Sequence, residues 1–112
     1  MEQTILEIIL NSGEARSLCL QAMSILKEHK YAEARALMIQ AKKPLNLAHK
    51  AQTNIIQEEA AGHRTEVSLL MIHAQDHLMT TLSIRDIVEV MIDYAEQIGS
   101  ELLKGKESNC ND

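Results

Sequence analysis

The sequence is poor in aromatic residues: it has no Trp and no Phe, and Tyr31 and Tyr94 are its only aromatic side chains. Aromatic rings form the stacking platforms of single-strand nucleic-acid sites and are common anchors in sugar-binding clefts. The net charge of −5 is also the wrong sign for binding a phosphate backbone. These features argue against nucleic acid as a partner, and against a lectin or a glycosidase.

Cysteine pairs and long apolar runs are also missing. Cys19 and Cys110 are too few for a disulfide framework and too far apart for a CxxC metal or redox motif. No run approaches the roughly 18 to 20 apolar residues that span a bilayer, and the start Met1-Glu2-Gln3 lacks the basic residues of a signal peptide. We therefore expect a cytoplasmic protein that does not insert into the membrane.

Proline and glycine are scarce, with one Pro and four Gly among 112 residues. Ala, Leu, Met, Glu, Gln and Lys are abundant, and apolar residues recur every three or four positions. This composition predicts an all-α fold in one domain over residues 1–104. The spacing predicts helices over about 2–28, 31–60 and 66–103, followed by a flexible polar tail over 105–112.

Individual residues refine this outline. Gly13 is expected inside the first helix, because Ile8 and Ala15 keep helical spacing across it. Pro44 lies within the second helical pattern and removes one backbone hydrogen bond, which predicts a kink. Thr65 suits the N-cap of the third helix. Connections this short join antiparallel neighbours, so the predicted architecture is an up-down-up bundle.

The third predicted helix carries two apolar stripes instead of one. One stripe suits the core of the chain and comprises Val67, Met71, Ala74, Leu78 and Leu82. The other contains a short polar island and comprises Leu69, His73, Asp76, His77, Thr80, Ile84, Ile87, Val88 and Met91. Because a three-helix monomer buries one stripe, the second stripe predicts a homo-oligomer whose other chains cover it.

The polar island His73-Ala74-Gln75-Asp76-His77 places two imidazoles four residues apart, with a carboxylate between them. A neutral imidazole is a nucleophile, so a histidine here could accept a phosphoryl group and pass it on. The same spacing suits a zinc site, or a hydrolase in which Asp76 is the general base. It also suits polar residues that set the register of an oligomer seam. Spacing alone leaves these four interpretations open.

Three segments together resemble one known family. The string VSLLMIHAQDHLMTT over Val67–Thr81 is similar to the signature helix of the lactose/cellobiose-type enzyme IIA of the bacterial phosphoenolpyruvate-dependent sugar phosphotransferase system. Ile9–Leu18 resembles the first helix of that family, and Ala48–Thr53 resembles the middle of its second. The match runs in order through most of the chain, from about Ile5 to Leu103.

The resemblance implies a homotrimer of three-helix protomers, with the third helices around the threefold axis. It implies that His73 takes a phosphoryl group from the phosphocarrier HPr as a tele-phosphohistidine, and passes it to a cysteine of the cognate IIB component, which serves the sugar permease IIC. Asp76 from each of three subunits would bind a divalent cation, usually taken as magnesium. Gln75 and His77 would flank the acceptor, contacting the phosphoryl group or fixing the ring tautomer.

Two positions depart from the family pattern. Pro44 falls where the family continues a regular helix, and Gly62-His63-Arg64 replaces a more glycine-rich turn. We therefore expect a bend in the second helix and a changed entry angle into the third. The alternative function on these residues is a noncatalytic trimeric scaffold or regulatory bundle, stabilised by metal, which needs Asp76 but not His73.

Overall fold

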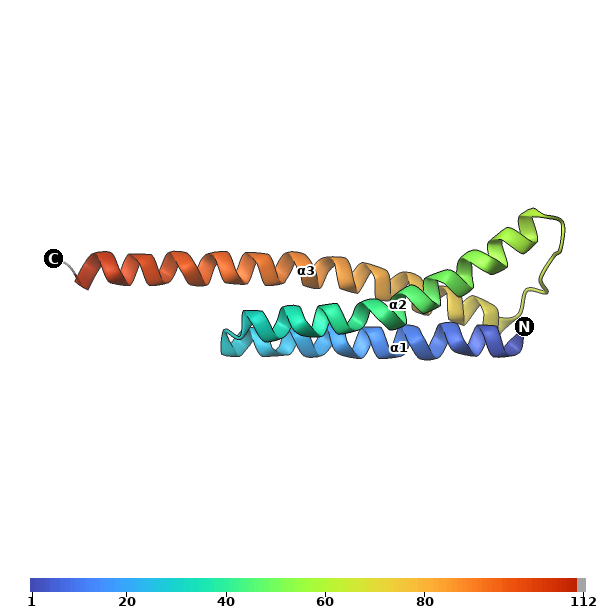
Figure 1. The fold of residues 1–112 in the computed structure, drawn as a ribbon, viewed down its shortest axis with the longest axis horizontal. Coiled ribbons are helices and arrows are strands. Elements are labelled where there is room, and N and C mark those ends of the chain that lie inside the picture. The colour runs from blue at the N-terminus through green and yellow to red at the C-terminus, as the bar shows by residue number, and fades with distance from the viewer. Residues whose placement is uncertain (111–112) are drawn as a thin grey trace.

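The computed structural model describes the backbone of residues 1–110 and the side chains of residues 1–105. It consists of α1 (Glu2–Ile25), a short 3-10 helix (Leu26–Glu28), α2 (Tyr31–Ala60) and α3 (Leu69–Cys110), and residues 1–110 contain no strand. Helix α2 returns antiparallel to α1, and α3 runs parallel to α1 (Figure 1). The predicted all-α, three-helix, up-down-up bundle is confirmed.

Helix α2 contains a buried proline in its middle. Pro44 has no N–H to donate to the carbonyl of Gln40, yet the backbone is helical on both sides of it. Figure 1 shows α2 lying along α1 over its first half and turning away over its second half, so the predicted bend is present. The helix ends at Ala60, and Gly62 follows with a φ of 95° that favours glycine.

Helix α3 begins at Leu69, three residues later than predicted. The Ser68 hydroxyl accepts a hydrogen bond from the Met71 N–H at 3.1 Å, and the Ser68 carbonyl accepts one from the Ile72 N–H at 3.1 Å. Ser68 is therefore the N-cap, and the prediction of Thr65 was wrong. Both residues have a suitable hydroxyl, and the backbone hydrogen bonds that select between them are not visible in the sequence.

Helix α3 extends well past the turn between α1 and α2 (Figure 1). At about 1.5 Å per residue its 42 residues span about 63 Å, and the longest dimension of the molecule is 72 Å. The predicted helix end near 103 was wrong, because residues 105–110 of the predicted tail continue the helix. Gly99 and Gly105 both lie inside α3, and a glycine weakens a helix interior without ending it. Residues 111–112 and the Cys110 side chain lie outside the described residues.

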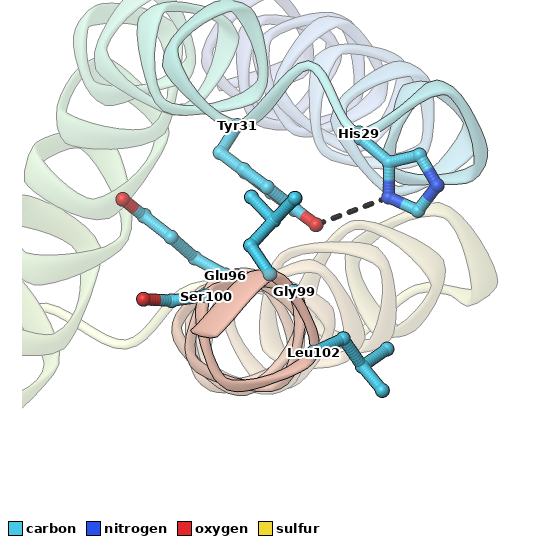
Figure 2. Close-up of a pocket in the computed structure, with 7 residues that line it drawn as sticks. His29, Tyr31, Glu96, Gly99, Ser100 and Leu102 are labelled. Carbon is cyan, nitrogen blue, oxygen red and sulfur yellow. Dashed lines mark hydrogen bonds between the residues drawn. The ribbon is translucent and has the colours of Figure 1, made fainter. Parts of the chain in front are cut away.

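Side chains at the start of α2 hold this far part of α3. Arg35 donates a hydrogen bond to Asp93 at 2.9 Å and pairs with Glu96. The Tyr31 hydroxyl packs against Gly99, where an added Cβ would lie only 2.5 Å from its oxygen. Figure 2 shows Tyr31 reaching across to Gly99, with its hydroxyl bonded to the His29 ring at 3.1 Å.

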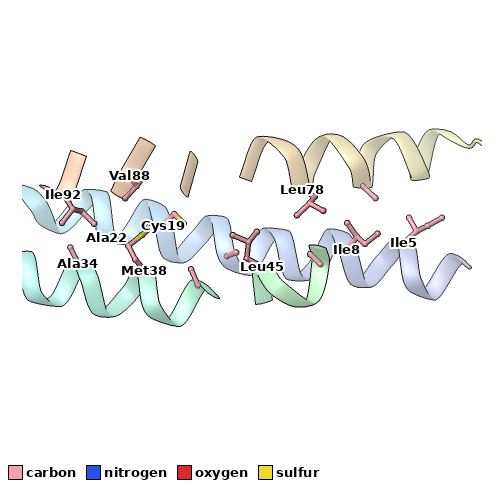
Figure 3. Packing of buried hydrophobic residues seen from close by; sticks show 14 of the residues in the cluster. Ile5, Ile8, Cys19, Ala22, Ala34, Met38, Leu45, Leu78, Val88 and Ile92 are labelled. Carbon is pink, nitrogen blue, oxygen red and sulfur yellow. The ribbon is translucent and has the colours of Figure 1, made fainter. Parts of the chain in front are cut away.

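The core is one layer of small and aliphatic side chains between the helices (Figure 3). Helix α1 contacts both other helices more extensively than they contact each other. Its inward residues Ile8, Ser12, Ala15 and Cys19 are completely buried, and the helix continues through Gly13 as predicted. Burial raises the pKa of the free Cys19 thiol, which makes it an unreactive core residue.

The inward face of α3 repeats every seven residues and comprises Met71, Ala74, Leu78, Thr81, Val88 and Ile92. The predicted inward stripe lacked Thr81 and Ile92, and it differs at three further positions. Val67 is 77% exposed, Leu82 is half-buried at the edge of the core, and Val88 belongs to the inward face rather than the outward one. The predicted stripe departs from the observed inward face along the helix, because helices that pack side by side keep a repeat near 3.5 residues.

The outward face of α3 is apolar and uncovered in the single chain. Leu69, Ile87, Val90 and Tyr94 are each more than half exposed. Patches of this kind mark surfaces that bind another protein.

Within residues 1–110, no helix combines the length and the apolar character that crossing a membrane requires.

Candidate functional site

The two histidines of the polar island form a stacked pair near the start of α3. The His73 and His77 rings have centroids 5.8 Å apart and planes inclined by 12°. They stack because residues four apart lie on the same side of a helix, one turn from each other. His73 is exposed, whereas His77 is half-buried. The His73 ring is therefore the one that another molecule can reach.

His77 lies against α1. A Cβ built on Gly13 would lie 3.4 Å from the His77 Nε2 atom, an ordinary contact distance, so this nitrogen lies close to α1 at the half-buried Gly13. The Thr81 hydroxyl lies 2.7 Å from the His77 carbonyl oxygen and 3.4 Å from the Ser12 carbonyl oxygen. The Thr81 hydroxyl thus donates mainly within α3, and it packs against α1 at Ser12 next to the histidine pair.

Burial lowers the pKa of His77, and the positive charges of His73 and Arg16 lower it further. A histidine with a lowered pKa is neutral at physiological pH. His77 therefore supplies a neutral ring beside His73, with one nitrogen that donates a hydrogen bond and one that accepts.

Gln75 lies on a different side of α3. Its side-chain oxygen accepts a hydrogen bond from Gln52 of α2, and its side-chain nitrogen lies 3.8 Å from the Met71 sulfur. Within one chain these contacts direct the Gln75 amide toward α2 and away from the histidine pair. Its predicted contact with a phosphoryl group stays a prediction.

Asp76 is exposed on the outward face of α3. Among the described residues its carboxylate forms no hydrogen bond or ion pair, while its backbone carbonyl accepts a hydrogen bond from the Thr80 hydroxyl at 2.8 Å. One chain thus presents a single free carboxylate on a mainly apolar surface.

The histidine pair does not form a zinc site within one chain. Chelation requires ring nitrogens that converge on one point about 2.0 to 2.1 Å from each. The two rings stack with centroids 5.8 Å apart, and two imidazoles alone leave the four-coordinate geometry of zinc incomplete. In the part of the chain that the structure describes, no three His, Cys, Asp or Glu side chains come together as a metal site.

A cavity at the far end of the bundle is separate from the histidine pair. It is lined by His29, Tyr31, Gly99 and Leu102, among others (Figure 2). Gly99 lies 26 residues beyond His73 on the same helix, which corresponds to about 39 Å. This cavity cannot serve chemistry at His73.

The predicted site residues all lie on the third helix, whereas α1 also borders the histidine pair. The structure adds Gly13, where an added Cβ would lie 3.4 Å from the His77 Nε2 atom, and Arg16, whose charge lowers the pKa of His77. The only available signal was the resemblance of the segment Ile9–Leu18 to the family's first helix. That resemblance marks the segment without giving any of its residues a chemical role.

Comparison with known proteins identifies relatives over nearly the whole chain. Residues 3–96 match the family model described as PTS system, Lactose/Cellobiose specific IIA subunit. The chain is 43% identical to the lichenan-specific phosphotransferase enzyme IIA component of Bacillus subtilis, over 88% of this chain and 89% of that protein. It is 39% identical to the N,N'-diacetylchitobiose-specific EIIA component of Escherichia coli, over 88% of this chain and 84% of that protein.

Solved structures show the same fold. The cellobiose-specific enzyme IIA from Bacillus anthracis superposes with a TM-score of 0.84 at 43% identity, covering 88% of this chain and 91% of that chain. The chitobiose IIA, solved in complex with HPr, superposes with a TM-score of 0.75 at 37% identity, covering 88% of this chain and 95% of that chain.

Proposed function

The chain belongs to the lactose/cellobiose-specific IIA family of the phosphotransferase system, and we propose that it relays a phosphoryl group on His73, taking it from phospho-HPr and delivering it to a cysteine of the cognate IIB component. The observation that carries this proposal is the stacked pair in which an exposed His73 lies beside a neutral His77. An accessible imidazole is what a relay between two proteins requires.

The transfer is an exchange of bonds to phosphorus. The Nε2 of His73 bonds to phosphorus while the phosphorus–nitrogen bond in the donor breaks, and the reverse exchange passes the group to a thiolate sulfur of IIB. Water takes no part, so each partner must exclude it as it docks. The exposed position of His73 lets two partners reach the same ring in turn.

His77 supports the phosphorylated state. A phosphoryl group adds a charge of about −1.5 to −2 beside a ring that is neutral before transfer. A neutral ring does not add positive charge that would hold the group in place, yet it can donate one hydrogen bond to a phosphoryl oxygen.

The donor is supported by a relative. A chitobiose IIA of the same fold has been solved in complex with HPr. We therefore assign HPr as the donor and the IIB component of the same permease as the acceptor. A relay protein must release one before meeting the other, so both contacts are expected to be weak and short-lived.

We further propose that three copies assemble with the outward faces of α3 around a threefold axis. Leu69, Ile87 and Val90 would then be buried, and Asp76 would come from three chains to one place. A magnesium ion takes about six oxygen ligands. One Asp76 does not satisfy that need, whereas three carboxylates and bound water fit it. When bound, the cation neutralises three clustered negative charges, and no step of the relay passes through it.

The test is reconstitution of the complete relay with enzyme I, HPr, phosphoenolpyruvate and the cognate IIB. Wild type should carry label from HPr to the IIB cysteine, and His73→Ala should stop it. His49→Ala, which removes an exposed histidine of α2, is the matched control and should behave as wild type. Correctly assembled wild type that takes no label from phosphorylated HPr would contradict the relay and support the scaffold alternative.

A further inference from the structure

Arg16 is the cationic side chain that α1 and α3, the helices bordering the histidine pair, hold near that pair. It is the only Lys or Arg in α1, and α3 has none from Leu69 to Ile84. Arg85, the next residue of α3, pairs with Asp86 at 2.9 Å. Arg16 is exposed, and among the described residues its guanidinium forms no ion pair. Its donor N–H groups are therefore available to a ligand.

The fold places Arg16 beside the histidine pair. Helix α1 runs parallel to α3 (Figure 1) and approaches His77 at Gly13, where an added Cβ would lie 3.4 Å from the ring nitrogen Nε2. Arg16 follows Gly13 by three residues and therefore lies on the same side of α1. A helical side chain lies over the turn N-terminal to its own Cα, which for Arg16 is the turn that contains Gly13. Electrostatic interaction between Arg16 and the His77 ring agrees with this placement.

A guanidinium is well suited to a phosphoryl group on the neighbouring ring. The group carries a charge of about −1.5 to −2 and three acceptor oxygens. The planar fork of Arg donates two parallel hydrogen bonds to two such oxygens. The ring centroids of His73 and His77 are 5.8 Å apart, about one helical turn. An Arg side chain that starts beside His77 can therefore extend to a group on His73.

We propose that Arg16 binds the phosphoryl group carried on His73: its guanidinium donates hydrogen bonds to phosphoryl oxygens, and its charge stabilises the phosphorylated chain. The inference rests on the proposed relay through His73. Arg16 keeps its proton throughout, so it adds no step to the exchange of bonds at phosphorus. It gives α1 a role in a site whose other proposed residues all lie on α3.

The experiment measures the equilibrium constant for phosphoryl exchange between HPr and this chain. Phospho-HPr and the unphosphorylated chain are mixed at concentrations too low for their complex to accumulate, and all four free species are quantified. Because only free species enter this constant, it reports the surroundings of the phosphoryl group and not the strength of docking. Arg16→Gln should shift the equilibrium about tenfold toward phospho-HPr, since it removes hydrogen bonds between charged groups.

Two control variants separate a contact from a general effect of charge. Arg16→Lys keeps the charge without the fork, so its shift should be smaller, about threefold. Lys27→Gln changes the net charge by the same amount as Arg16→Gln, at an exposed position of the short 3-10 helix, and should leave the constant unchanged. Both positions are exposed and helical, so the three variants should keep the wild-type melting temperature.

NMR on the wild type locates the contact without a substitution. The Nε–H signal of the Arg16 guanidinium should move when the chain becomes phosphorylated, because a hydrogen bond to a charged oxygen changes its surroundings. The corresponding signal of Arg35 is the internal control. Arg35 pairs with Asp93 and Glu96 on the far part of α3, so its signal should stay in place.

An equilibrium constant that is unchanged in Arg16→Gln, or moved equally by Lys27→Gln, would overturn the inference. So would an Arg16 signal that does not respond to phosphorylation. Weaker binding of unphosphorylated HPr with an unchanged constant would make Arg16 a docking residue, which also contradicts the proposal. A wild type that accepts no phosphoryl group would overturn the relay itself, and the inference with it, whereas the other outcomes leave the relay standing.

Discussion

The two faces of α3 have similar apolar content and different surroundings. Met71, Leu78 and Ile92 on the inward face are buried by α1 and α2, whereas Leu69 and Ile87 on the outward face are exposed to solvent. A single chain buries the inward face and leaves the outward face uncovered. The outward face of α3 therefore has the character of a surface that binds another protein, and the proposed trimer would cover it.

The histidine pair lies at the border between the two faces. His77 is half-buried against α1, and His73 is exposed one turn away. A site at such a border combines a ring that is held in place with one that a partner protein can reach. The uncovered face beyond it bears Asp76.

The largest expected effect comes from the inward face. Leu78 is completely buried, so Leu78→Ala should lower the free energy of unfolding by about 3 kcal/mol through lost burial and a cavity. The same substitution at Leu102, which is 64% exposed, should change it by less than about 0.5 kcal/mol. Urea denaturation at one fixed protein concentration measures both free energies of unfolding. Equal losses in the two variants would contradict the difference in burial between the inward face and the exposed surface.

Next in size is the effect of charge on the outward face. If the α3 helices meet there, Ile87→Glu places like charges together in an apolar seam, and the particle should fall to the mass of one chain, 12.6 kDa. Ile39→Glu, at a similarly exposed isoleucine of α2, should leave the assembly intact. Sedimentation of the two variants measures the mass of each particle. An unchanged mass for Ile87→Glu would mean that the interface does not include this part of α3.

A smaller effect is expected at Asp76. Asp76→Leu replaces a free carboxylate on this face with an apolar side chain, so the trimer should persist when divalent cations are removed by a chelator. Wild type should loosen under the same treatment, because its three carboxylates would then repel one another. Sedimentation with and without chelator gives the comparison, and a monomeric Asp76→Leu would contradict this account of the axis.

The smallest effect is a dependence of stability on pH. Because the pKa of His77 is lowered on folding, the unfolded chain binds more protons than the folded chain as the pH falls below about 6.5. Stability should therefore fall in that range, and His77→Gln should remove part of the fall. Denaturation curves at pH values above and below about 6.5 measure it, and identical pH profiles for the two proteins would show that His77 titrates alike in both states.

Much of the fold follows from the sequence. The three helices, the continuity of α1 through Gly13 and the bend in α2 were predicted from spacing and from the position of Pro44. The errors concern the ends and register of α3, where Ser68 rather than Thr65 forms the cap and Val88 faces inward. Such details depend on neighbouring helices, which impose a seven-residue repeat that the isolated pattern does not contain.

The candidate site was predictable in part. The HAQDH string identified His73 and His77, and four-residue spacing correctly implied that they lie on one side of the helix. It could not show that Gln75 turns toward Gln52 of α2, because that depends on where the second helix lies. Nor could it show Gly13 beside His77, since a contact between residues 64 positions apart follows from packing rather than from local pattern.

The most direct test of the central claim is to find where the phosphoryl group resides. The chain would be incubated with enzyme I, HPr and phosphoenolpyruvate, digested at neutral or alkaline pH, and mapped by mass spectrometry, with acid treatment of a parallel sample. We expect an acid-labile phosphoryl group on His73 that is absent from His73→Ala and present in His49→Ala. A phosphoryl group on another residue, or none on a wild type mixed with phosphorylated HPr, would contradict it.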